Sequence, residues 1–254
     1  MRFASLGSGS EGNGLIVEAG GTVVMIDCGF GVRDARARLA RLGVDAASIA
    51  AILVTHEHGD HIRGVAPLAA RHRIPVWSTF GTLEAAGERF AGTVRGFGFD
   101  SHETFAIGAL EVCPFPVPHD AREPVQFVIG DGGRRLGVLT DLGVSTPHVE
   151  ASLSGCDALV LECNHDVGML ADGPYPYPLK QRIASRLGHL DNETAAALLA
   201  ALDCSRLKHV VAAHLSKQNN TPDKARAALA RSLHCAPDWI GVADQADGFA
   251  WREI

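Results

Sequence analysis

The sequence lacks the features of membrane and secreted proteins. It contains no apolar run that approaches the ~20 residues needed to span a bilayer, and it does not start with a basic segment followed by an apolar one. Its six cysteines are scattered without a Cys-x-x-Cys pair, so we expect reduced thiols, none of them needed as a metal ligand. These absences predict a cytoplasmic protein with no membrane partner.

The sequence also lacks a linker, an internal repeat and a low-complexity tract, and one domain over residues 1–254 is therefore expected. Its formal net charge of −6 argues against a surface covered with groups that bind nucleic acid. Nucleic acid is not excluded, because metal ions bound in a cleft would supply local positive charge.

The periodicity of apolar residues predicts an α+β fold. Turn signals and short apolar runs indicate strands at 3–6, 15–18, 23–27, 50–54, 76–78, 110–117, 125–129, 136–140, 158–162, 210–213, 239–242 and 249–251. Helical patterns cover 32–42, 61–71, 83–90, 193–202 and 222–232. Two mixed sheets packed face to face, with helices outside, would accommodate these elements as an αββα sandwich.

Residues 55–61, Thr-His-Glu-His-Gly-Asp-His, are the most informative stretch. They follow a predicted buried strand, and extended side chains repeat every second residue, so His56 and His58 would point to one side. Asp60 and His61 would then begin the next helix. A structural core does not gather so many polar rings on one turn, and the cluster therefore predicts metal binding.

A site for two metals needs more ligands than this loop provides, and rigid strand ends are where they are expected. His119, Asp141 and His214 each follow a predicted strand. An aspartate in that place is more often a cap or turn residue, but next to the loop cluster the ligand role is favoured.

The expected arrangement has two divalent ions, zinc or manganese, held by seven side chains. The first ion would be bound by His56, His58 and His119, the second by Asp60, His61 and His214, with Asp141 bridging them. Paired metals are suited to the hydrolysis of phosphate esters.

With these residues the chain resembles the metallo-β-lactamase-fold hydrolases over essentially its whole length. The resemblance rests on the His-x-His-x-Asp-His motif together with all seven ligand positions. It implies an αββα sandwich with the active site along one edge of the two sheets.

Further segments resemble one branch of this family, the WalJ (YycJ) group, which is associated with 5′→3′ exonuclease action on DNA. These segments are Leu6–Asn13, Asp27–Gly29, Asn164–Asp166, Pro174–Pro176, Leu179–Ile183, Gly188–Leu190 and His214–Asn220. The chain departs from that group at Asp191, where the group usually has serine. The resemblance implies a dinuclear-metal phosphodiesterase with DNA as its substrate.

The Gly188-His189 segment is also similar to a stretch of the tRNA 3′-processing endonucleases, where a histidine works with a glutamate. In that comparison Glu162 would orient His189 as a general acid or phosphate contact. As a ligand of the second ion, Asp60 would also orient the nucleophile. Without the resemblance, the sequence would predict His189 to be a helix-capping or surface residue.

Four residues are predicted to bind substrate, namely His165, Ser216, Asn219 and Asn220. The last two have an alternative role in the loop before the N-cap Thr221. The glycine-rich loop 7–12 fits a dinucleotide fingerprint, but a strand and hairpin follow it instead of a helix. Ser8, Ser10 and Asn13 of this loop would contact substrate or form a structural turn.

Three other functions remain open at this point. One is hydrolysis of a small molecule, such as a cyclic phosphate or a thioester, by the same fold. A second is a di-iron redox protein, which is disfavoured by His58 in a position where those proteins have an acidic ligand. The third is an interaction module without catalysis, which is disfavoured by the intact ligand set.

Overall fold

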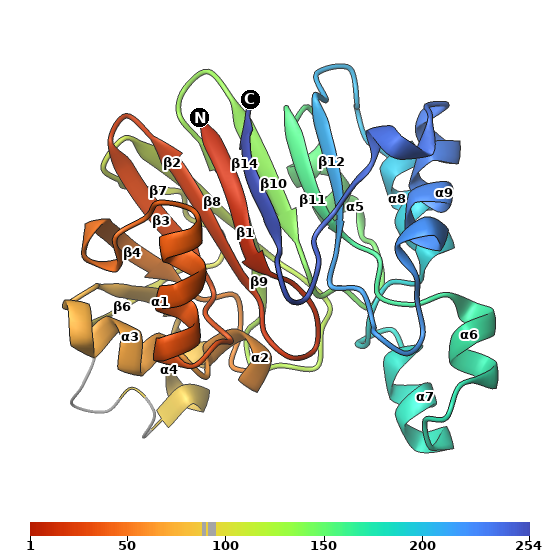
Figure 1. Cartoon of the computed structure of the whole chain (residues 1–254), viewed down its shortest axis with the longest axis horizontal. Helices are drawn as coiled ribbons and strands as arrows, with labels where there is room; N and C mark the ends of the chain where they lie inside the picture. Colours follow the sequence, from red (N-terminus) through yellow and green to blue (C-terminus); the bar gives the residue numbers. More distant parts are fainter. Residues whose placement is uncertain (88–89, 91–94) are drawn as a thin grey trace.

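The computed structural model describes residues 1–87, 90 and 95–254, and this part of the chain contains two seven-stranded β-sheets (Figure 1). One cluster of buried apolar side chains lies between the sheets, and a further cluster lies under the helices outside each of them. Both sheets contain parallel and antiparallel pairs. The predicted αββα sandwich is therefore confirmed.

The first sheet has the order β14-β1-β2-β3-β4-β5-β6. Strands β14, β1, β2 and β3 pair antiparallel, and β3 to β6 pair parallel. Their bounds are β1 Arg2–Gly7, β2 Gly14–Ala19, β3 Thr22–Ile26, β4 Ile49–Leu53, β5 Val76–Thr79, β6 Gly96–Phe99 and β14 Phe249–Glu253.

The second sheet has the order β13-β12-β11-β10-β9-β8-β7. Strands β10 to β13 pair parallel, and β7 to β10 pair antiparallel. Their bounds are β7 Phe105–Ile107, β8 Leu110–Pro116, β9 Val125–Gly130, β10 Arg135–Leu139, β11 Ala158–Glu162, β12 His209–Ala213 and β13 Gly241–Val242.

The alternation of side chains along each strand explains the layers. On β2 and β3, Ile16 and Met25 are directly paired and pack in the helix-side cluster, while Val17 and Val24 are paired and pack between the sheets. Because extended residues point to alternate faces, an apolar strand of this kind is buried on both sides.

The helices divide between the two sheets. Buried residues of α1, α3 and α4 pack on the first sheet, and those of α5, α8 and α9 pack on the second. Residues 167–183 form α6 and α7 at one end of the molecule, and we call this segment the arm (Figure 1). The helix bounds are α1 Val32–Arg41, α2 Gly59–Ile62, α3 Val65–His72, α4 Phe80–Ala86, α5 Pro147–Leu153, α6 Val167–Asp172, α7 Tyr177–Ile183, α8 Asn192–Ala201 and α9 Pro222–Leu233.

The prediction of a single helix over 61–71 is wrong, because two helices, α2 and α3, are separated there at Gly64. The Gly64 amide donates to the carbonyl of Cys28 at 2.8 Å, outside any helix. A β-carbon on Gly64 would lie 1.8 Å from the Phe30 carbonyl oxygen, so only glycine permits this close approach. The break ends α2 at Ile62, so Asp60 and His61 both lie in this short helix.

Other local differences concern short elements. The structure adds strands β6 and β7 and helices α5, α6 and α7, which are too short for a periodic pattern to be recognised. The strand predicted at 239–242 is reduced to β13, because residues 237–239 form a 3₁₀ turn. The helix predicted at 83–90 corresponds to α4, and its positions 88–89 lie outside the described residues.

The strand directions bring several chain segments to one edge of the sandwich. Strands β10, β11 and β12 are parallel, and β8 runs the same way because both β8 and β10 are antiparallel to β9. The segments that follow these strands therefore leave the sheet at the same edge. Among the described residues, no helix is both long enough and apolar enough to cross a membrane.

Candidate metal centre

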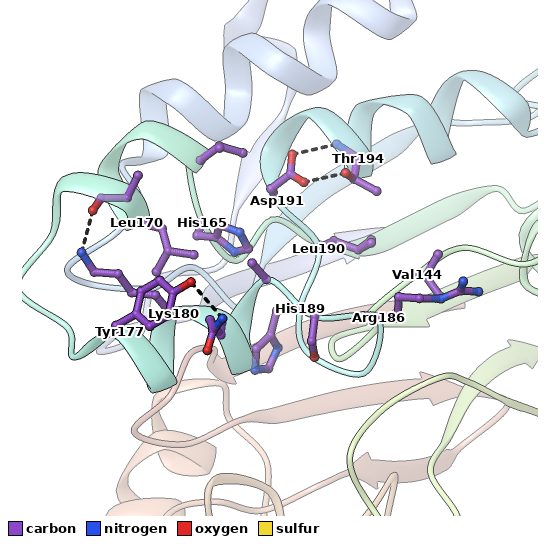
Figure 2. A pocket seen from close by; sticks show the side chains of 16 residues that line it. Val144, His165, Leu170, Tyr177, Lys180, Arg186, His189, Leu190, Asp191 and Thr194 are labelled. Carbon is purple, nitrogen blue, oxygen red and sulfur yellow. Dashed lines mark hydrogen bonds between the residues drawn. The ribbon is translucent and has the colours of Figure 1, made fainter.

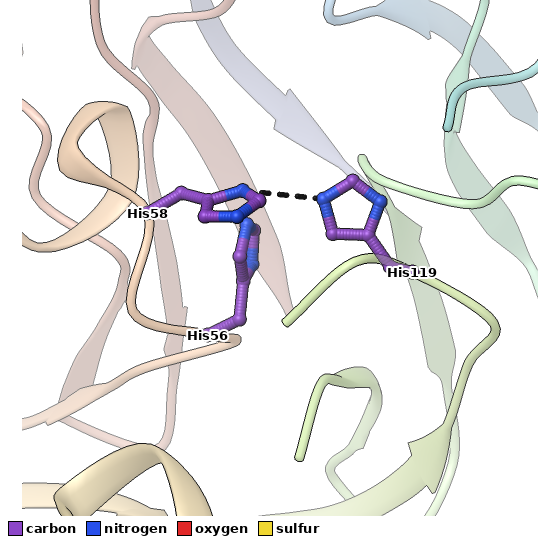
Figure 3. A group of neighbouring side chains, drawn as sticks. All are labelled: His56, His58 and His119. Atoms are coloured by element: carbon purple, nitrogen blue, oxygen red, sulfur yellow. Dashed lines mark hydrogen bonds between the residues drawn. The ribbon is translucent and has the colours of Figure 1, made fainter. Parts of the chain in front are cut away.

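Three histidine rings form the first group of candidate ligands. His56 and His58 come from the loop between β4 and α2, and His119 follows β8 (Figure 3). One ring nitrogen of each lies within 4.8 Å of the corresponding nitrogens of the other two. The predicted first ligand set is thus brought together in space.

The outer nitrogen of each ring has a partner that fixes its hydrogen. Thr55 Oγ1 gives its hydrogen to Asp27 and so accepts from His56 Nδ1 at 3.0 Å. His119 Nδ1 donates to the Gly188 carbonyl at 3.0 Å, and His58 Nε2 donates to the Asp120 carbonyl at 3.2 Å. The inner nitrogens therefore carry lone pairs, which is the state of a neutral histidine that binds a metal.

Two of these inner nitrogens face each other. His119 Nε2 and His58 Nδ1 are 3.3 Å apart (Figure 3), and His56 Nε2 is buried with no hydrogen-bond partner among the described residues. A buried nitrogen without a partner costs about 1–3 kcal/mol. A cation between the three rings would satisfy all of them, so the donor set fits a metal ion.

The second group consists of Asp60, His61 and His214. His61 Nδ1 donates to Asp27 Oδ2 at 2.8 Å, and His214 Nδ1 donates to Glu162 Oε1 at 3.1 Å. The remaining Nε2 atoms of both rings are 3.4 Å from Asp60 Oδ2. This group also presents two ring nitrogens and a carboxylate to one point, as predicted for the second ligand set.

Asp141, the residue after Thr140 at the end of β10, lies between the two groups. Its Oδ2 is 3.1 Å from His61 Nε2 in the second group, and its Oδ1 is 3.8 Å from His119 Nε2 in the first. Asp141 Oδ2 has no hydrogen bond to any described residue although it is buried. Asp141 Oδ1 is also 3.3 Å from His189 Nδ1 and 3.4 Å from His214 Nδ1, so the carboxylate lies between the two groups and beside His189.

The electrostatics of the two groups are complementary. Burial lowers the pKa of His56 well below its usual range, and the nearby His61 ring adds to the effect, so the His56 ring is neutral. At His61 burial acts in the same direction, but Asp141 and Asp60 outweigh it and raise its pKa well above the usual range. The carboxylates of the second group thus favour positive charge there, from a proton or from a metal cation.

Asp27 is a site residue that sequence reasoning missed. Its Oδ1 accepts from the Thr55 amide at 2.8 Å, and its Oδ2 accepts from Thr55 Oγ1 at 2.7 Å and from His61 Nδ1. Its backbone is left-handed, with φ of 58°, a conformation more readily adopted by aspartate than by most residues. The signals in the sequence were its place at the end of an apolar run and its membership of the Asp27–Gly29 segment, neither of which pointed to a contact with His61.

The glycine-rich loop supports the second group from behind. Ser8 Oγ accepts from the His214 amide at 2.9 Å and donates to Asn13 Oδ1 at 3.2 Å. The side-chain nitrogen Nδ2 of Asn13 donates to Asp60 Oδ2 at 3.3 Å. Ser8 and Asn13 are buried, so these contacts fix the His214 backbone and the Asp60 side chain in place.

Glu162 connects His189 to the metal centre. Its Oε1 accepts from His189 Nδ1 at 2.8 Å as well as from His214 Nδ1. Its Oε2 accepts from the Leu142 and Leu190 amides, so both oxygens are committed to orienting other groups. Burial opposes a charge on His189, but the Glu162 carboxylate outweighs it and raises the pKa of His189.

A cavity of about 380 Å³ opens over these groups. Asp60, Asp141, His189 and His214 line it, and Arg182 of α7 lies on the arm side. Arg182 Nε donates to Asp120 Oδ2 at 2.6 Å, which links the arm to the residue that holds His58. The candidate metal ligands are therefore open to a substrate.

The four predicted substrate-binding residues lie in different places. Ser216 lines the cavity over the metal ligands, and His165 lines a second cavity beside it. Asn220 bonds to Asn192 and to the Cys163 carbonyl, and Asn219 bonds to Ser216. Neither asparagine is among the described residues that line either cavity, and substrate contact at all four positions stays a prediction.

Comparison with known sequences relates the chain to one family. Residues 22–214 match the family described as the beta-lactamase superfamily domain. The chain is 35% identical to a protein of Bacillus anthracis named exodeoxyribonuclease YycJ, over 92% of this chain and 89% of that one. It is 31% identical to the Streptococcus pneumoniae protein named exodeoxyribonuclease WalJ, over 95% of this chain and 91% of that one.

Solved structures give the same fold. The metallo-β-lactamase-fold protein YhfI of Bacillus subtilis superposes with a TM-score of 0.77 at 17% identity, covering 99% of both chains. Zn²⁺-bound PqqB of Methylobacterium extorquens superposes with a TM-score of 0.76 at 20% identity, covering 100% of both. At these identities the likeness establishes the arrangement of elements.

Proposed function

The chain belongs to the beta-lactamase superfamily as a metallo-β-lactamase-fold hydrolase, and from this premise we propose that it is a metal-dependent nuclease with DNA as substrate, acting as a 5′→3′ exonuclease. The observation that carries the proposal is the convergence of two ligand groups on Asp141 beside the pair of His189 and Glu162. The relatives named exodeoxyribonucleases, which align over nearly the whole chain, support the choice of DNA.

We assign seven residues to hold two divalent ions, zinc or manganese, with His56, His58 and His119 for one and Asp60, His61 and His214 for the other. Asp141 would bridge them, since its two oxygens face the two groups. Bound divalent ions lower the pKa of water and offset the negative charge that develops on phosphoryl oxygens.

The chain's own residues supply the proton transfer. Hydrolysis adds a hydroxyl to phosphorus and breaks the bond to the leaving oxygen, which takes up a proton. His189 lines the cavity, and its Nδ1 is fixed by Glu162, so Nε2 is the nitrogen that would give the proton to the leaving oxygen. Asp60 also lines this cavity and would orient the attacking water.

We also propose that residues 1–254 act as one domain. The cluster of buried residues between the sheets takes side chains from both halves of the chain, for example Val24 and Leu53 with Val160 and Val211. Neither half would keep its apolar face covered without the other.

The test of this function is hydrolysis of single-stranded DNA labelled at one end, with zinc or manganese added to chelator-treated protein. We expect metal-dependent release of mononucleotides from the 5′ end. Parallel reactions with RNA and with bis(p-nitrophenyl) phosphate separate a nuclease from a small-molecule phosphodiesterase. Turnover of the small ester alone, or of a thioester alone, would overturn the proposal.

A further inference from the structure

A second cavity, of about 630 Å³, lies beside the metal centre between the arm and the start of α8 (Figure 2). Its volume is within the range of about 300–1,000 Å³ found for ligand sites in proteins. His189 lines both this cavity and the one over the metal ligands. A substrate with one atom next to His189 could therefore occupy both cavities at once.

The walls of this second cavity are mostly apolar and include an aromatic ring. Leu170 of α6 and Leu190 before α8 are buried side chains of the lining. Tyr177, the first residue of α7, is 71% exposed, and its hydroxyl accepts a hydrogen bond from Gln181 Nε2 at 3.0 Å (Figure 2). The ring is thus held at the cavity while its surface remains free to stack.

His165 adds a polar group without a net charge. The residue is 3% exposed and lines the cavity, and its Nδ1 has no hydrogen-bond partner in the part of the chain that the structure describes. Burial lowers the pKa of His165, so the ring is neutral near pH 7. A neutral ring with uncommitted hydrogen-bonding capacity suits the edge of a nucleobase better than a phosphate.

Two charged groups of the lining already have partners. The Asp191 carboxylate accepts from the amides of Glu193 and Thr194 at the start of α8. Lys180 Nζ donates to the Ala171 carbonyl at 2.6 Å. Arg186, the third charged residue of the lining, is exposed to solvent. The buried part of the lining, around Leu170, Leu190 and His165, therefore favours a flat, uncharged ligand with an apolar face.

We propose that this cavity binds the base of the nucleoside that carries the leaving oxygen, with the base stacked on Tyr177 and its edge at His165. The proposal rests on the proposed function, because His189 at the boundary of the two cavities marks where the leaving oxygen lies. In 5′→3′ digestion that releases nucleoside 5′-monophosphates, the bond between phosphorus and the 3′ oxygen breaks, so the nucleoside that carries the leaving oxygen is the 5′-terminal one. Stacking tolerates every base, so the pocket would accept any terminal nucleotide.

Equilibrium binding tests the cavity independently of turnover. The probes are a deoxynucleoside 5′-monophosphate and deoxyribose 5-phosphate, measured by calorimetry on the metal-loaded protein. We expect the nucleotide to bind about 5- to 150-fold more tightly, which corresponds to about 1–3 kcal/mol for one stacked base. In Tyr177→Ala this difference should largely disappear, whereas in Tyr177→Phe it should remain.

Kinetics on DNA provide the second readout. A single strand whose 5′-terminal residue lacks its base should be cleaved by the wild-type protein with a kcat/KM lower by about the same factor. The matched control is Phe80→Ala, since Phe80 is 63% exposed and begins α4 as Tyr177 begins α7, but it is not among the described residues that line either cavity. It should discriminate between the two substrates as the wild type does.

The outcomes distinguish this inference from the proposed function. Equal binding of the two probes by the wild type, or undiminished discrimination by Tyr177→Ala, overturns the base pocket even if DNA is hydrolysed. Tight, Tyr177-dependent binding of the nucleotide without any hydrolysis of DNA would support the pocket and overturn the nuclease.

Discussion

The edge of the sandwich that carries the seven candidate ligands, the metal edge, lies beside the arm. The two regions differ in how deeply their side chains are buried. At the metal edge His56, His61 and Glu162 are fully buried, and the ring nitrogens that face outward are held by fixed acceptors. In the arm Leu170 is the buried residue of α6, and none of α7 is buried. The difference agrees with the two proposed roles, because catalysis needs ligands fixed to within a fraction of an ångström, whereas a surface proposed to accept varied bases does not.

The largest expected effect comes from removing the shared carboxylate of the metal edge. Asp141→Asn keeps the shape of the side chain but provides one oxygen instead of two. We expect less metal per chain by mass spectrometry and a loss of more than about 100-fold in kcat/KM, since residues that only orient ligands already cost about 10–100-fold. Normal metal content with full activity in this variant would remove Asp141 from the centre.

A smaller effect is expected from Asp27→Asn, which takes away one of the two oxygens that hold Thr55 and His61. Metal affinity, measured by competition with a chelator, should fall by about 10–100-fold. Asp157→Asn is the matched control, because Asp157 is equally buried but bonds to Arg135 and Arg206 away from the metal centre. Equal metal affinities of the two variants would show that Asp27 has no specific effect on metal binding through Thr55 and His61.

Glu162→Gln tests whether the glutamate acts through His189. We expect kcat to fall by about 10–100-fold with a smaller change in KM, because the imidazole loses its fixed orientation. If Glu162 works through His189, the Glu162→Gln/His189→Gln double variant should lose little more kcat than His189→Gln alone. Additive losses would mean that its main role is at His214.

The smallest effect is expected in the arm. Arg182→Gln removes an ion pair in which the arginine side chain is 61% exposed, and the free energy of unfolding should change by less than about 1 kcal/mol in urea titrations. Arg206→Gln is the comparison, because its partner Asp157 is buried and would lose one of its cations. A large loss from Arg182→Gln would contradict the view that the arm adds little to stability.

Much of the metal centre was predictable because its signal is local or tied to strand ends. Residues 56–61 supply four donors in one turn, and His119, Asp141 and His214 each follow an apolar run. The break at Gly64 was not predictable in the same way. It depends on the approach of the Phe30 carbonyl, which belongs to a segment distant in sequence.

The sequence by itself determined the types and spacing of the donors, and with them the class of chemistry, because few residue types bind metals and strands repeat every two residues. The tertiary structure decided which ring nitrogen of each histidine faces inward. Asp27 meets Thr55 and His61 because β3 and β4 pair side by side in the first sheet, and the Gly188 carbonyl meets His119 because the segment after α7 lies beside the end of β8. The Gly188 carbonyl can reach His119 only if the chain turns tightly after α7. A β-carbon on Gly188 would lie 2.1 Å from the Ile183 carbonyl oxygen at the end of that helix, so the turn requires glycine.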